Sequence, residues 1–254
     1  MVINVLFLIW GMSLGSFLNV IIYRIPRGFL VSLPRRSYCI GCSKKIPWYE
    51  NIPVLGYLFI RGRCTTCKTS IDLRHPVIEF MTGILVFAVY AQMGLTLDVL
   101  YYVAFALSLL AVTFIDLEFR IIPDRISKPM IVLGLLGSFF VNQNTPFQSF
   151  LGAAIGWFSF WAMAKAYEKI KGIEGLGYGD VKLLALIGAF LGYKALLGVI
   201  LISSIAGSVI GLLVIIFARG NLKTAVPYGP FLSFAALVML FWGEVINKFL
   251  YPSV

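Results

Sequence analysis

Long stretches without a charged residue run along most of this 254-residue chain and limit its fold more than any other feature. A helix needs about 20 apolar residues to cross the hydrocarbon core of a bilayer. A polar cluster at residues 142–146 favours a turn and divides one of the stretches in two, so the sequence predicts about eight membrane-spanning helices. The uncharged or nearly uncharged stretches are residues 1–23, 76–97, 99–115, 129–164, 181–193, 195–218 and 225–249.

The composition supports a membrane protein and excludes two other classes. Hydrophobic residues make up 60% of the chain and charged residues 13%, whereas a soluble domain has about 25% charged residues. A mean hydropathy of +0.93 also excludes an intrinsically disordered chain. The apolar runs are continuous and lack the alternation of barrel strands, so the expected fold class is an all-α polytopic membrane protein. No basic residue precedes the first stretch and no small-residue cleavage pattern follows it, so we expect a retained helix and not a signal peptide.

Positive charge is concentrated in residues 24–75, which carry ten of the 21 Lys and Arg residues. Because cytoplasmic loops are enriched in these residues, we expect this segment in the cytoplasm and the N terminus outside. With eight spans, 19 of the 21 basic residues then fall on the cytoplasmic side. The net charge of +10 therefore indicates membrane topology, and we expect a lipid bilayer as partner and no nucleic acid.

The expected organisation has three parts. Residues 1–23 form the first transmembrane helix, and residues 76–254 form membrane helices 2–8. The segment between them, residues 24–75, is far longer than a connection requires, and loops of more than about 15 residues usually carry function. We therefore expect a cytoplasmic loop domain there.

The four cysteines lie in that loop as two CxxC pairs separated by 21 residues: Cys39, Cys42, Cys64 and Cys67. Thiols stay reduced in the cytoplasm, so two disulfide bonds are disfavoured. Paired CxxC motifs commonly bind zinc in a tetrahedral site of four thiolates. Four cysteines leave no position for a metal-bound water, so the expected zinc is structural, and it would fold a loop that has little apolar core of its own.

Acid–base chemistry in this chain has to rest on carboxylates, because His75 is the single histidine and is expected to be an interfacial residue at the start of a helix. Asp116 ends the third predicted helix and Asp180 opens the sixth, so the topology brings both to the cytoplasmic boundary. Ionisable residues at such a depth are functional candidates. Two carboxylates that share one proton can hydrolyse a peptide, since the ionised group activates water while the protonated group polarises the carbonyl.

Neighbouring residues refine this hypothesis. Glycines at positions 175, 177 and 179 would let the backbone approach an extended substrate closely and let Asp180 move. Asp124, eight residues after Asp116, is expected to cap the next helix. Two other functions stay open: a proton-coupled membrane transporter would use the same carboxylates as a relay, and a zinc-organised scaffold would not need them.

Six short motifs occur in a fixed order over nearly the whole chain. They are GSFLNV at 15–20 with RIP at 24–26, PWYENIP at 47–53, RHPVIE at 74–79, FID at 114–116 with IPD at 122–124, GYGDVK at 177–182, and PYGP at 227–230. Together they resemble the motifs of the bacterial type IV prepilin peptidases, which are aspartic proteases of the GxGD type. The joint order is specific, whereas any single motif could be accidental in an apolar chain.

The resemblance implies a function for the two aspartates. Asp116 and Asp180 would be the catalytic pair of an aspartic endopeptidase in the cell inner membrane. The enzyme would cleave the short basic leader of prepilin or pseudopilin precursors at the cytoplasmic face, just after a glycine. Its further partners would be the assembly machinery of type IV pili or type II secretion.

The resemblance also implies methylation of the new N-terminal amine with S-adenosylmethionine. Enzymes of this family usually carry that activity in the N-terminal half, where the candidate cofactor-binding residues are Glu79, Asn19, Arg24 and Gly62. Glu79 has a plainer explanation, because a carboxylate in the first turn of a helix is favoured by the helix dipole. A leader peptidase without methyltransferase activity is the alternative within the enzyme class.

Overall fold

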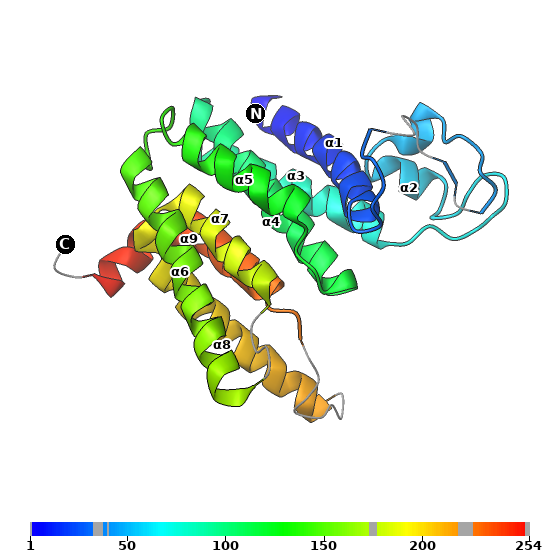
Figure 1. Ribbon diagram of the computed structural model, residues 1–254. Helices are drawn as coiled ribbons and strands as arrows, with labels where there is room; N and C mark the ends of the chain where they lie inside the picture. Colours follow the sequence, from blue (N-terminus) through cyan, green and yellow to red (C-terminus); the bar gives the residue numbers. More distant parts are fainter. Residues whose placement is uncertain (1, 33–37, 40, 173–176, 218–225, 252–254) are drawn as a thin grey trace. The chain divides into compact units, whose positions relative to one another are not determined.

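The computed structural model describes residues 2–32, 38–39, 41–172, 177–217 and 226–251, and in these ranges its regular secondary structure is helical apart from two isolated β-bridges (Figure 1). The expected all-α fold is confirmed. The elements are α1 (Val2–Arg24), η1 (Trp48–Asn51), α2 (Leu55–Phe59), α3 (Arg74–Met93), α4 (Leu97–Phe119), α5 (Asp124–Gly137), α6 (Pro146–Lys171), α7 (Tyr178–Leu191), α8 (Tyr193–Phe217) and α9 (Gly229–Leu250).

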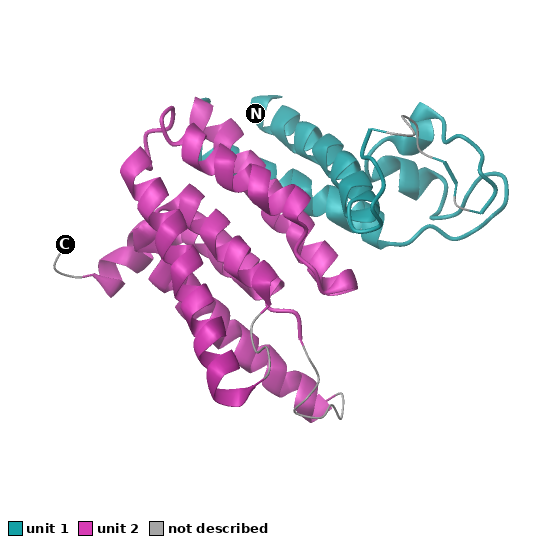
Figure 2. Cartoon of the chain, viewed as in Figure 1, with its two compact units in different colours: residues 1–95 teal, residues 96–254 magenta. Residues whose placement is uncertain are grey.

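The chain divides into two compact units, residues 1–95 and residues 96–254 (Figure 2). Unit 1 contains α1, α3 and the loop with η1 and α2, and unit 2 contains α4 to α9. All four cysteines therefore belong to unit 1, and both candidate aspartates belong to unit 2.

Unit 1 is built on close packing of α1 against α3. Gly11 and Gly15 face α3, and a Cβ atom at Gly15 would lie 2.6 Å from the Cα atom of Glu79. Small residues spaced four apart let two apolar helices approach closely in a membrane. This approach brings polar side chains of α1 to the start of α3, where the Asn19 amide donates a 3.1 Å hydrogen bond to the carbonyl of His75.

Unit 2 is built around α4, which packs against α5 and α9. The most apolar part of α4 is 72% buried, against 11% for α8, so α4 lies in the core and α8 at the periphery. The helix α6 packs against α7 where Gly152 and Gly188 face each other and leave no room for a Cβ atom.

The short helix α7 is enclosed by protein. Its 14 residues extend about 21 Å at 1.5 Å per residue, less than the roughly 30 Å of a hydrocarbon core. From Val181 to Phe190 every residue except Lys182 is buried. Neighbouring helices therefore cover α7 in place of lipid, and Asp180 lies in its first turn.

Five of the helices in the described part of the chain are long and apolar enough to cross a membrane: α1, α3, α4, α8 and α9. The chain is accordingly a multi-pass membrane protein. Each of the eight predicted segments contains a helix, but α5 and α7 have only 14 residues and α6 is less apolar. The count of eight crossings stays a prediction.

The predicted break at residues 142–146 is confirmed. The helix α5 ends at Gly137 and α6 begins at Pro146. Thr145 caps α6 through a reciprocal pair of bonds with Gln148, so the side chain of each residue binds the backbone of the other. The polar residues thus satisfy the free amides of a helix start.

Candidate functional site

The four cysteines form one cluster in unit 1, with their sulfur atoms within 4.8 Å of one another. The Sγ atoms of Cys39 and Cys67 are 3.6 Å apart, and those of Cys42 and Cys64 are 3.9 Å apart. These separations are too long for disulfide bonds. They match a tetrahedron of thiolates around zinc, in which a Zn–S bond of about 2.3 Å gives a sulfur separation of about 3.8 Å.

The two CxxC segments share a backbone hydrogen bond and a residue with positive φ. The amide of Cys39 donates to the carbonyl of Lys44, and the amide of Cys64 donates to that of Thr69, both at 2.9 Å. The fourth residue after each first cysteine, Ser43 and Lys68, has a positive φ of 55° and 61°. Each turn therefore points its two thiols inward, and two such turns can surround one ion.

The environment of Cys67 favours the thiolate that a metal requires. The Thr69 hydroxyl lies 3.1 Å from Cys67 Sγ. Hydrogen bonds from the side chain and the backbone of Thr69 lower the pKa of the Cys67 thiol to about 6. A thiol with this pKa is largely ionised at neutral pH. Against a backbone hydrogen bond with Lys44, which lowers it, burial and the neighbouring thiols raise the pKa of the Cys42 thiol to about 11. The fit of the four residues to a zinc ion therefore rests on the spacing of their sulfur atoms.

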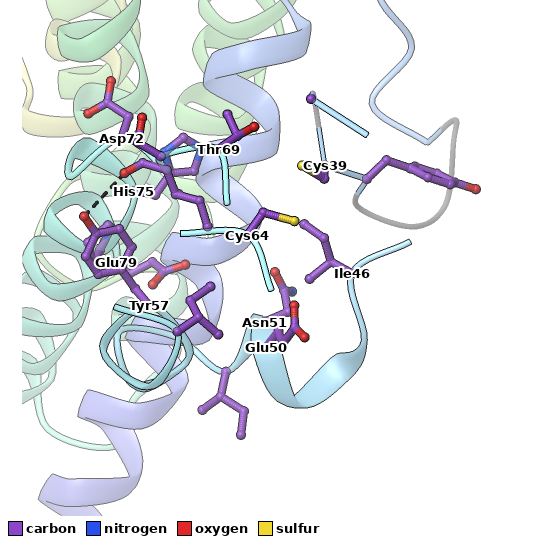
Figure 3. Close-up of a pocket in the computed structure, with 17 residues that line it drawn as sticks. Cys39, Ile46, Glu50, Asn51, Tyr57, Cys64, Thr69, Asp72, His75 and Glu79 are labelled. Carbon is purple, nitrogen blue, oxygen red and sulfur yellow. Dashed lines mark hydrogen bonds between the residues drawn. The ribbon is translucent and has the colours of Figure 1, made fainter. Parts of the chain in front are cut away.

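A cavity of about 320 Å³ lies in unit 1 beside this cluster (Figure 3). Its walls come from the loop and from the first turns of α3, and they include Tyr57, His75 and Glu79. Glu50 and Asp72, the only acidic residues in the basic segment 24–75, both line it as well. The cavity therefore combines three carboxylates with an aromatic ring.

One cofactor candidate from the sequence, Glu79, lines the cavity directly, and its Oε2 atom accepts a 2.7 Å hydrogen bond from the backbone amide of Val54. Val54 has a φ of 60°, which is rare for a β-branched residue and marks a strained turn. The suggestion that Glu79 lies in the first turn of a helix is wrong, because α3 begins at Arg74 and Glu79 is in its second turn. The loop and α3 are thus joined through this carboxylate.

The other three candidates lie outside the lining of the cavity. Gly62 packs against Tyr57, which lines the cavity. Its φ is 65°, and a Cβ atom built on it would lie 2.6 Å from the Tyr57 hydroxyl. The side-chain amide of Asn19 donates a hydrogen bond to the carbonyl of His75. Arg24 donates a 2.9 Å bond to the carbonyl of Val31 and so fixes the start of the loop.

The sequence predicts His75 only as an interfacial residue at the start of a helix, but it is also part of the cavity wall. Its buried Nδ1 atom has no hydrogen-bond partner among the described residues. Sequence reasoning also missed Tyr57, Glu50 and Asp72. The signal that could have found the two acids is their isolation within a strongly basic segment.

In unit 2, Asp116 and Asp180 are held at the end of α4 and the start of α7. Ile122 links their surroundings, because it lies 3.0 Å from a Cβ atom built at Gly179 and 3.3 Å from one built at Gly229. Gly179 precedes Asp180, and the amide of Gly229 donates a 3.0 Å hydrogen bond to Asp116 Oδ2. Both acids therefore lie close to Ile122, at the same end of unit 2.

The two carboxyls have different surroundings. Asp116 is 5% exposed and bonded to the first residue of α9. Asp180 is half-buried, and within the described ranges its carboxyl makes no hydrogen bond. Gly177 is the N-cap of α7, and Gly175 lies outside the described residues. Gly229 is a residue that the sequence did not single out as part of the site.

The prediction that Asp124 caps a helix is wrong. The N-cap of α5 is Pro123, and Asp124 is the first helical residue, without a capping bond. Its carboxylate instead pairs with Lys128 at 2.7 Å and with Lys182 of α7. The two basic side chains attract the carboxylate away from the free amides of α5, and the ion pair ties α5 to α7.

Comparison with known proteins decides the family. A model described as "Type IV leader peptidase family" matches residues 103–212, and one described as "Bacterial Peptidase A24 N-terminal domain" matches residues 9–93. The chain belongs to the type IV leader peptidase family. The match to the leader peptidase model lies within unit 2, and the match to the N-terminal domain model lies within unit 1. No solved structure matches the chain.

Three relatives, each named prepilin leader peptidase/N-methyltransferase, illustrate the similarity. A protein of Pseudomonas putida is 34% identical over 93% of this chain and 89% of its own length. One from Aeromonas salmonicida strain A449 is 33% identical over 97% and 93%, and one from Pseudomonas aeruginosa PAO1 is 31% identical over 94% and 90%. The similarity thus covers both units.

Proposed function

We propose that this chain cleaves the basic leader of prepilin or pseudopilin precursors and then methylates the new N-terminal amine. The observation that carries the peptidase proposal is that Asp116, bonded to Gly229, and Asp180, next to Gly179, both lie near Ile122 in unit 2. The names of the relatives, which cover both units, support the combination of two activities.

In the proposed cleavage, the two carboxyls share one proton because two adjacent negative charges repel each other. Asp116 accepts a hydrogen bond from the backbone amide of Gly229, and this bond stabilises the ionised carboxylate. Asp116 is therefore the base that takes a proton from water. Asp180 makes no such bond within the described residues and holds the proton, which it donates to the scissile carbonyl. The tetrahedral diol that forms collapses when Asp116 gives its proton to the leaving nitrogen and Asp180 takes one back from a hydroxyl, so the peptide bond breaks without a covalent enzyme intermediate.

The orientation proposed for the enzyme follows from its charges. Segment 24–75 faces the cytoplasm, the N terminus lies outside, and the aspartates are at the cytoplasmic face of the inner membrane. This is the side on which the basic leader of a precursor would remain. Pilus or type II secretion machinery would take up the processed product.

For methylation, we propose that the unit 1 cavity binds S-adenosylmethionine. A volume of about 320 Å³ is near the lower limit for small-molecule sites, which is roughly 300 Å³. The cofactor supplies a methyl group from a positively charged sulfonium, and Glu50, Asp72 and Glu79 offer three carboxylates to a cation. Tyr57 offers an aromatic face. The same carboxylates can bind the substrate ammonium and take up its proton.

The remaining candidates would support this cavity. Gly62 leaves room for Tyr57, Asn19 fixes the start of α3, and Arg24 fixes the start of the loop. A structural zinc on Cys39, Cys42, Cys64 and Cys67 would hold the loop walls together, because two of these cysteines, Cys39 and Cys64, line the cavity. Residues 24–75 are accordingly the proposed centre of the methyltransferase region.

Mass spectrometry of a prepilin incubated with the purified protein tests both activities separately. Without S-adenosylmethionine we expect loss of the leader alone, and with it we expect loss of the leader and gain of one methyl group. Absence of leader loss would contradict the peptidase. Leader loss that is never followed by a methyl group would make the chain a peptidase only. The transporter and scaffold alternatives predict neither product.

A further inference from the structure

The helix α2 in the cysteine loop exposes its apolar face. Leu55, Leu58 and Phe59 follow the spacing of one helix face and are 52%, 62% and 79% exposed. The opposite residues face inward, since Gly56 is buried against the backbone of Glu50 and Tyr57 lines the cavity. An amphipathic helix of a water-soluble domain would bury this face.

The adjoining segment η1 adds two exposed aromatic residues. Trp48 is 79% exposed and Tyr49 is 56% exposed, with their rings in an edge contact at 6.0 Å. Gly56 touches the carbonyl of Glu50, so η1 and α2 lie directly side by side. We call Trp48, Tyr49, Leu55, Leu58 and Phe59 the outer loop surface. Trp and Tyr together with Leu and Phe are the residues enriched where a protein meets the headgroup layer.

The loop is also tethered to the membrane at both ends. It leaves α1 at Arg24 and joins α3 at Arg74, and both helices are long and apolar enough to cross a bilayer. Both ends of the loop therefore start from one membrane surface. Contact with that surface costs little additional chain entropy, because the loop is already confined beside it.

The charge of the loop identifies the lipid that suits it. Segment 24–75 has ten Lys and Arg residues and only two acids, Glu50 and Asp72. Both acids line the cavity, whereas Lys45 and Arg61, which flank η1 and α2 in the chain, are exposed, so the charge beside the outer loop surface is basic. Basic residues beside an apolar surface are attracted to anionic headgroups.

We propose that the outer loop surface inserts into the headgroup layer of an anionic bilayer, the same membrane that α1 and α3 cross. The aromatic and leucine side chains lie among the headgroups, and the basic residues of the loop bind lipid phosphates. The arrangement holds the cavity beside the membrane surface. It does not depend on either enzymatic activity, so its failure would leave the proposed function untouched.

Quenching of Trp48 fluorescence in nanodiscs tests this contact in the full-length protein. Because the chain has five tryptophans, emission from Trp48 is obtained by subtracting the spectrum of a Trp48→Phe variant. The lipid is a mixture of phosphatidylglycerol and phosphatidylcholine, brominated either close to the headgroup or close to the bilayer centre. We expect Trp48 emission to fall at least about twofold with the shallow bromines, and to fall less with the deep ones.

Three outcomes would overturn the proposal. Trp48 emission that neither lipid quenches would show that water, another part of the chain or a second copy covers this surface. Stronger quenching by the deep bromines would indicate insertion into the hydrocarbon core. Equal quenching in discs of phosphatidylcholine alone would remove the anionic requirement.

A pair of variants keeps the test independent of folding. Leu58→Ser with Phe59→Ser should reduce the quenching of Trp48 at least about twofold while zinc content stays that of the parent. Leu95→Ser is the matched control, because Leu95 is 71% exposed in the same unit but lies beyond the other end of α3. If the double variant keeps its zinc and its full quenching, the proposal is wrong.

Discussion

The backbone amide of Gly229 donates a 3.0 Å hydrogen bond to Oδ2 of Asp116, although the two residues are 113 positions apart in the chain. Gly229 is the first residue of α9, so the positive end of that helix faces the carboxylate. The Tyr228 hydroxyl lies 2.8 Å from the Ser203 hydroxyl and ties the same turn to α8. The last two helices therefore position a residue of α4.

Replacing Gly229 by Ala should impair leader cleavage. A Cβ atom there would lie 2.6 Å from Asp116 Oδ2, so the carboxylate would have to shift. We expect kcat for leader cleavage to fall at least about tenfold, because displacing a catalytic group weakens interactions made in the transition state. Cleavage kinetics on a purified prepilin measure this effect.

Gly211→Ala is the matched control, since no atom lies within 4 Å of a Cβ built at Gly211 on α8. It should cleave at the parent rate. Parent activity in the Gly229 variant would mean that Asp116 tolerates a new position and that the α9 amide does not hold it for catalysis.

Asp116→Asn and Asp180→Asn should each abolish leader cleavage, by at least about a thousandfold, because neither member of a pair that shares one proton works alone. Methylation of an already cleaved pilin should continue in both variants, because the proposed cofactor cavity lies entirely in unit 1. Mass spectrometry of intact and precleaved substrates separates the two outcomes.

Asp124→Asn provides the comparison for these two variants. Its carboxylate pairs with Lys128 and Lys182, with Asp124 and Lys128 both well exposed. The exposed pair with Lys128 contributes little to stability, and Asn keeps an oxygen that can accept a hydrogen bond from the largely buried Lys182, so the variant should keep at least about a tenth of the parent rate. A folded Asp124 variant without cleavage activity would require a different catalytic pair.

The features that the sequence predicts well are those with short-range signals. Continuous apolar runs predict the helices, because only a helix satisfies its backbone within one segment in lipid. The spacing of Cys39, Cys42, Cys64 and Cys67 predicts a cluster, because each pair needs only a local turn, and the four sulfurs do lie together. The all-α membrane fold follows from the same runs.

The features that it does not predict depend on contacts between distant segments. The cavity requires Glu79 of α3 to reach the strained turn at Val54. The bond from Gly229 to Asp116 requires two helices to meet end to end. Asp124 carries a strong local preference for capping, but Lys182, 58 positions away, competes for its carboxylate. Tertiary contacts of this kind leave no periodic pattern in a sequence.

Purified protein should contain close to one zinc ion per chain, and Cys39→Ser or Cys64→Ser should lose it. One missing thiolate opens the tetrahedron, and the loop walls around the cavity depend on its closure. Metal analysis measures the ratio, and methyl incorporation should fall with it. A disulfide bond between any of the four cysteines in intact cells would contradict the metal site and the cytoplasmic position of the loop.

Glu79→Gln should reduce methyl incorporation at least about tenfold while leaving leader cleavage unchanged, because the change removes one of the three carboxylates that face the cavity. Glutamine has nearly the same shape and keeps an oxygen that can accept the 2.7 Å bond from the Val54 amide, so the turn should remain folded. Methyl transfer to a precleaved pilin and cleavage of an intact one are measured in parallel. Glu244→Gln, an exposed glutamate of α9 in unit 2, is the control and should keep both activities. Equal loss of both activities in the Glu79 variant would assign Glu79 a structural role, and full methylation would move the cofactor site away from this cavity.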